Sequence, residues 1–103
     1  MDTNLPPVDT STTRKIVEIG AKPGMGGEMR AALFGLEAAT RLEPGCRAFT
    51  FYQALSSPER FLLIEDFTSQ AALEAHLKAP YTQAFFALGL AADIRPIDKD
   101  WLR

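Results

Sequence analysis

Apolar positions follow strand-like spacing in some stretches of the chain and helical spacing in others. Residues 15–21 are rich in β-branched side chains and end at the turn Lys22-Pro23-Gly24, which is typical of a strand. From Met25 the period becomes helical, and Pro44-Gly45 ends that helix because proline disfavours helical backbone angles in the preceding residue. The apolar stripe of this helix is formed by Met25, Met29, Leu33, Leu36 and Ala39/Thr40.

The second half of the chain predicts a hairpin, a broken helix and a last strand. Strands are expected over 46–55 and 60–67, and the short loop between them is typical of an antiparallel hairpin. Thr68 or Ser69 can cap a helix over 69–77, and Pro80 suits the first position of a further helical turn that Gly89 ends. A strand over 92–97 completes the order β-α-β-β-α-β. This order predicts a ferredoxin-like α+β fold, with one antiparallel sheet and helices on one face.

The predicted strand 46–55 carries aromatic residues on both faces. Phe49 and Phe51 share one face with Arg47 and Gln53, while Tyr52 lies on the opposite face with Ala48 and Thr50. The helices can cover only one face of the sheet. We therefore expect the other face to meet a second sheet, in a homodimer whose subunits pack their sheets face to face.

Composition and charge narrow the possible classes of protein. The chain has 103 residues, 47% of them hydrophobic and 23% charged, which suits one globular domain. Eleven basic against thirteen acidic residues argue against a nucleic-acid partner, and no apolar run approaches the roughly 20 residues that span a membrane. Residues 1–13 are polar and lack a secretory signal, so we expect a flexible tail there and the domain over 14–103. With Cys46 as the only cysteine, a cytoplasmic location is expected.

His76 and Glu65 are the main candidates for chemistry. His76 is the only histidine, and it shares the inward stripe of its predicted helix with Leu73, Leu77 and Pro80. It either accepts a proton from substrate or is a core histidine held by a carboxylate or a carbonyl. Glu65 shares a strand face with Phe61, Leu63 and Phe67, so it needs a polar partner. The expected partners are His76, Arg47 or Arg95, and Glu65 either orients His76 or makes a purely structural hydrogen bond.

Other polar residues have ordinary explanations. Glu37 and Arg41 form an i,i+4 pair, Arg41 suits the end of its helix, and Glu43 is assigned to the turn or to a dimer contact rather than to chemistry. Cys46 is expected to be structural. One histidine, one cysteine and no clustered carboxylates do not suit a transition metal, so no metal site is expected.

Three stretches resemble the antibiotic biosynthesis monooxygenase (ABM) family. They are residues 22–24, 40–46 and 65–76, and the last ends a strand with an acid, follows it with an aromatic, and places a histidine on the next helix. The resemblance implies a dimeric α+β barrel. It also implies, for some members, oxygenation of phenolic or quinol-type aromatics by O₂ without a cofactor. Haem degradation, another chemistry of this fold, is not expected, because Phe86 stands where an axial histidine would be expected.

These observations together predict a cofactor-independent monooxygenase that acts with O₂ on a phenolic, quinol or polyketide-like aromatic. His76 and Glu65 are the catalytic candidates. Two alternatives remain open: an isomerase or lyase acting on a small oxygenated metabolite, and a non-catalytic dimeric module that binds a ligand. The residues expected to bind substrate are Tyr52, Tyr81, Phe51, Phe85 and Arg47.

Overall fold

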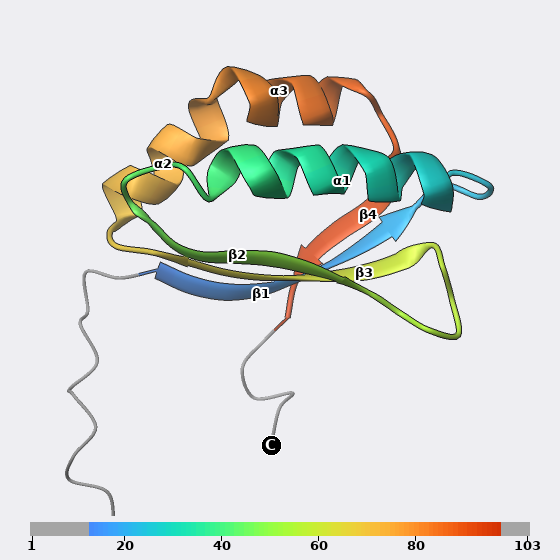
Figure 1. Ribbon diagram of the computed structural model, residues 1–103. Helices are drawn as coiled ribbons and strands as arrows, with labels where there is room; N and C mark the ends of the chain where they lie inside the picture. Colours follow the sequence, from blue (N-terminus) through green and yellow to red (C-terminus); the bar gives the residue numbers. More distant parts are fainter. Residues whose placement is uncertain (1–12, 98–103) are drawn as a thin grey trace, which may run out of the picture.

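The computed structural model describes residues 13–97 as a four-stranded antiparallel sheet with three helices on one face (Figure 1). The order confirms the predicted β-α-β-β-α-β arrangement, with the second helix split in two. The predicted tail lies outside the described residues apart from Thr13, which is the first residue of a strand, and residues 98–103 also lie outside. The elements are β1 (Thr13–Ala21), α1 (Gly26–Thr40), β2 (Cys46–Gln53), β3 (Arg60–Phe67), α2 (Gln70–Lys78), α3 (Pro80–Ala87) and β4 (Ala91–Pro96).

The strand order β2-β3-β1-β4 puts β3 and β1 in the centre of the sheet and β2 and β4 at its edges. Every neighbouring pair is antiparallel. The register places Glu65 of β3 between Phe49 of β2 and Lys15 of β1. Residues opposite one another share a face, so this register decides which side chains the helices cover.

The core lies between the sheet and the helices. On β3 the alternate residues Phe61, Leu63, Glu65 and Phe67 are all buried, as their spacing predicts. Phe49 and Phe67 are the largest fully buried side chains. The predicted stripe of α1 faces this core with Met29, Leu33, Leu36 and Thr40.

The opposite face of the sheet, which we call the open face, carries no helix among the described residues (Figure 1). Aliphatic side chains there are partly exposed, with Ile64 at 42%. Ion pairs cross this face between strands. Glu18 binds Arg60 at 2.8 Å and Arg95 at 2.6 Å, and the Asp66 carboxylate lies within 4 Å of Arg14 and Arg47.

Arg47 differs from its predicted position. The register between β2 and β3 shifts between Cys46 and Ala48, which inserts an extra residue into β2 and interrupts the alternation of faces. Arg47 therefore reaches Asp66 on the open face and does not share the face of Phe49. No helix within residues 13–97 has the length and apolar character needed to span a membrane.

Candidate functional site

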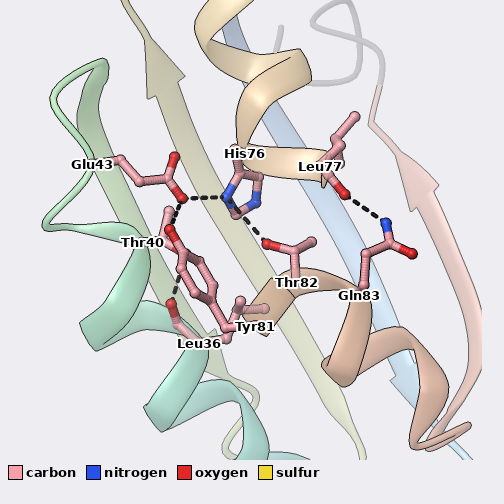
Figure 2. A network of polar contacts seen from close by, with 8 residues as sticks. All are labelled: Leu36, Thr40, Glu43, His76, Leu77, Tyr81, Thr82 and Gln83. Carbon is pink, nitrogen blue, oxygen red and sulfur yellow. Dashed lines mark hydrogen bonds and ion pairs between the residues drawn. The ribbon is translucent and has the colours of Figure 1, made fainter. Parts of the chain in front are cut away.

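Three polar side chains meet where the C-terminal end of α1 approaches α2 and α3 (Figure 2). The Glu43 Oε2 atom lies 3.0 Å from His76 Nδ1 and also accepts a hydrogen bond from the Tyr81 hydroxyl. His76 is 4% exposed, and the Glu43 side chain is 17% exposed. One carboxylate oxygen therefore links a buried imidazole to a phenol. We call Glu43, His76 and Tyr81 the His76 cluster.

His76 lies on the inner side of α2 and packs against two neighbouring aromatic rings. Its ring centroid is 5.1 Å from that of Phe49 and 5.2 Å from that of Phe67. Leu73, one turn earlier, is buried on the same side. Leu77 and Pro80 are exposed, so the prediction that they share this inner stripe is wrong. The imidazole thus has a carboxylate on one side and aromatic walls on others.

The loop after α1 brings Glu43 to the histidine. Backbone hydrogen bonds from Glu43 to Thr40 and from Cys46 to Glu43 fold residues 40–46 into a tight turn. Gly45 lies so close to α2 that a Cβ atom there would be 2.5 Å from the Ala72 Cβ atom. Glycine at this position therefore lets the loop pack directly on the helix that carries His76.

The break between α2 and α3 brings Tyr81 and Thr82 to the same place. Ala79 has an extended backbone with ψ of 143°, as expected of a residue before proline, and Pro80 starts α3. The turn places the buried Thr82 Oγ1 atom 3.5 Å from His76 Nδ1 (Figure 2). The two residues are six positions apart, a spacing that a continuous helix would put on different sides.

The hydrogen bonds define how this cluster holds its protons. An ionised Glu43 only accepts, so His76 donates from Nδ1, and in a neutral imidazole this tautomer carries its lone pair on Nε2. Burial and the hydrogen bond to Glu43 raise the pKa of Tyr81 to about 12, so its hydroxyl remains a donor. The arrangement can take up a proton at Nε2 while Glu43 stabilises the resulting imidazolium.

Glu65 faces the same interior but stands apart from this cluster. It is 7% exposed, and burial raises the pKa of its carboxyl, an effect that the charge of His76 partly opposes. The predicted partners make their ion pairs elsewhere, His76 with Glu43, Arg47 with Asp66 and Arg95 with Glu18, and of these three only the charge of His76 acts on Glu65. Glu43, and not Glu65, therefore makes the hydrogen bond that orients the His76 ring.

The residues expected to bind substrate lie on two different sides of the sheet. Phe51 packs edge-on against Phe49 with centroids 5.2 Å apart, and Phe85 is buried in the same core. Tyr81 belongs to the His76 cluster. Tyr52 is 53% exposed and lies opposite Leu62 on the open face, where Arg47 also reaches Asp66. Tyr52 and Arg47 therefore do not lie beside His76.

Glu43 is the functional candidate that sequence reasoning assigned to the turn. The signal was present, since Glu43 stands in one of the three stretches that carry the family resemblance. Burial and Glu43 raise the pKa of the nearby Cys46 thiol, which disfavours the thiolate. Within residues 13–97 no three His, Cys, Asp or Glu side chains are grouped in a way that could hold a metal ion.

Comparison with known proteins finds one family profile and two relatives that match most of the chain. The profile of the family described as antibiotic biosynthesis monooxygenase matches residues 13–88. A protein named "Putative monooxygenase Rv0793" from Mycobacterium tuberculosis is 31% identical over 72 residues, which is 70% of each chain. An uncharacterised Synechocystis protein, sll1783, is 33% identical over 67 residues, or 65% of this chain, and the chain spans about half its length, 46%.

A solved structure shares the fold. The crystal structure of PA3566 from Pseudomonas aeruginosa superposes with a TM-score of 0.79 at 26% sequence identity. The superposition covers 85% of this chain and 91% of that one. The arrangement of sheet and helices that forms the His76 cluster is therefore an arrangement found in an experimentally determined structure.

Proposed function

The chain belongs to the antibiotic biosynthesis monooxygenase family, and we propose that it oxidises a phenolic, quinol or polyketide-like aromatic with O₂ and without a cofactor. The observation that carries this proposal is the pairing of His76 with Glu43 at 3.0 Å, with the imidazole packed against the rings of Phe49 and Phe67. A base with aromatic neighbours suits a planar substrate that must lose a proton before it reacts with O₂.

In the proposed reaction His76 removes the phenolic proton at Nε2. Glu43 stabilises the imidazolium that forms, because its carboxylate accepts the hydrogen bond from Nδ1. The electron-rich anion then reacts directly with O₂. The substrate supplies all of the electrons, so one oxygen atom enters the product and the other leaves as water.

The remaining residues hold the substrate and balance charge. A neutral Glu65 carboxyl can donate a hydrogen bond to an oxyanion that develops on the substrate, which its burial and raised pKa support. Tyr81 keeps Glu43 in place through its hydroxyl. Phe51 and Phe85 extend the apolar surface around Phe49, on the face of the sheet that carries the base.

The active protein is proposed to be a homodimer in the cytoplasm, with the two open faces packed together. This face presents partly exposed aliphatic side chains, including Ile64, between ion pairs that link neighbouring strands. Such a face gains from being covered, and two identical copies are self-complementary about a two-fold axis. Tyr52 and Arg47 would then belong to the interface rather than to the site beside His76.

The test is turnover of a panel of quinols and phenols in air and under argon, with chelator present and no flavin or haem added. The proposal expects consumption of one O₂ per product and no reaction under argon. Turnover under argon would instead establish an isomerase or lyase. Tight binding without chemical change, seen by mass spectrometry of the bound compound, would establish a ligand-binding module.

A further inference from the structure

Strand β2 has an exposed edge and a sequence suited to pairing with another strand. It lies at the end of the sheet, with only β3 beside it. Residues 48–53 read AFTFYQ, and no charged residue occurs from 48 to 58. Aromatic and β-branched residues without charge or proline are typical of segments that form intermolecular β-sheets. Proteins commonly protect such an edge with a charged side chain on the strand itself, and β2 has none over these residues.

Two side chains bind groups at this edge: Glu37 of α1 and Arg41, the residue that directly follows α1. The Phe51 amide donates a hydrogen bond of 2.8 Å to Glu37 Oε2. Arg41 Nε donates one of 3.0 Å to the Phe49 carbonyl oxygen, and its terminal nitrogen donates another, of 2.8 Å, to Thr50 Oγ1. A carboxylate takes the place of a neighbouring strand's carbonyl, and a guanidinium takes the place of its amide.

The spacing of residues along a helix and along a strand explains how both side chains reach the edge of β2. Residues i and i+4 on a helix are separated by about 6 Å along the axis, since each residue rises about 1.5 Å. Residues i and i+2 on a strand are separated by about 6.7 Å and direct their backbone groups to the same edge. Arg41 caps α1 with a helical backbone conformation, so Glu37 and Arg41 match the spacing of Phe51 and Phe49 on β2, with the two elements running in opposite directions.

We propose that Glu37 and Arg41 close the edge of β2 against the β2 strand of a second copy of this chain. The occupant that they exclude is β2 itself, because two such strands can pair antiparallel about a two-fold axis with identical residues on both sides. Closure of this edge is compatible with the proposed association of copies through the open face. This inference does not depend on the proposed catalytic activity.

The test compares the double variant Glu37→Ala/Arg41→Ala with the matched control Glu28→Ala/Arg30→Ala. The control changes the same charges at exposed positions earlier on α1. We expect the first variant to form species larger than those of the wild-type protein in light scattering, increasingly with concentration, and to bind thioflavin T. The control should behave as wild type. Equal behaviour of the two folded variants would overturn the proposal.

Amide hydrogen exchange at Phe51 decides the matter if the double variant folds poorly. In the single variant Glu37→Ala, studied at low concentration, this amide should exchange at least about tenfold faster than in the wild type, because its charge-assisted hydrogen bond is lost. In the assembled species it should be protected again, as strand pairing requires. The variant Glu37→Gln/Arg41→Lys keeps an acceptor and a donor and should not assemble. An unchanged exchange rate in Glu37→Ala, or assembly with Phe51 unprotected, would contradict the proposal.

Discussion

The two faces of the sheet differ in how their polar side chains are bound. On the helix-covered face Glu65 and His76 are buried, and the cluster of Glu43, His76 and Tyr81 is held by short contacts from three different segments. On the open face arginines bind carboxylates in pairs that remain partly in solvent. Ion pairs of the second kind contribute little to stability, because water screens them and fixing long side chains costs entropy. This difference is the basis for proposing chemistry on the covered face and association through the open face.

The largest change in stability is expected from a large-to-small substitution in the core between the sheet and the helices. Phe49 is 1% exposed and contacts Phe51, Phe67 and His76. Its replacement in Phe49→Ala should lower the free energy of unfolding by about 3–5 kcal/mol, as for other large-to-small changes in a core. On the open face, Ile64→Ala should cost about 1 kcal/mol or less at concentrations at which the proposed dimer is dissociated, since Ile64 is 42% exposed in the single chain. Urea unfolding of both variants at one protein concentration measures the difference, and equal losses would break the comparison.

A smaller effect is expected on association when a charge is placed on the open face. Ile64→Glu should raise the dissociation constant of the proposed dimer by tenfold or more, because pairing would bury an unpartnered carboxylate at a cost of about 1–3 kcal/mol in each subunit. The control is Leu88→Glu, at a position 59% exposed at the end of α3. Sedimentation equilibrium gives both constants. A dimer equally tight in both variants would show that the copies associate elsewhere.

Removal of the tyrosine hydroxyl tests the His76 cluster without removing its base. Tyr81→Phe should cost about 1.5 kcal/mol in unfolding free energy, because Glu43 loses a hydrogen bond. The folded pKa of Tyr81 lies above its ordinary value of 10, at about 12. Between these values the unfolded chain releases the proton first, so wild-type stability should fall as pH rises from 10 to 12. The variant should lack that part of the pH dependence in urea titrations. Identical profiles for variant and wild type would contradict this assignment.

The smallest effect is expected at Glu65, where the substitution should raise the stability of the protein instead of lowering it. Burial raises the pKa of this carboxyl above its ordinary value of 4.5. Stability should therefore be unaffected below pH 4.5 and should fall as pH rises from there through the folded pKa, because the unfolded chain ionises more readily. Glu65→Gln removes this penalty and should be slightly more stable than wild type at pH 7. Lower stability of the variant at pH 7, measured by thermal unfolding, would mean that the ionised carboxylate has a partner.

The sequence predicted the order of elements because each boundary depends on local chemistry. Ser69 caps α2 by accepting a hydrogen bond from the Ala72 amide at 3.0 Å, Pro80 begins α3, and Gly89 has φ of 65° just after it. Arg47 could not be placed in this way, because a bulge in β2 depends on its pairing with β3.

The candidate site was harder to predict because its residues are distant in sequence. His76 was correctly expected to face the interior. Its partner Glu43 lies 33 positions earlier, on a loop whose approach to α2 depends on Gly45, and a single sequence does not show that approach. Glu65 seemed the better partner because its alternation with apolar residues shows burial. Alternation cannot show which of two acids lies within reach of the imidazole.

Turnover by the variant His76→Gln tests whether the helix-covered face holds a catalytic base. Glutamine retains a polar side chain but cannot accept the proton, so turnover of the best quinol or phenol substrate should fall by about 10²–10⁴-fold. Glu74→Gln, on the exposed side of α2, serves as the control, and thermal unfolding must show that both variants are folded. We expect turnover to be lost in His76→Gln and retained in Glu74→Gln. A folded His76→Gln protein that turns over substrate at the wild-type rate would contradict this expectation.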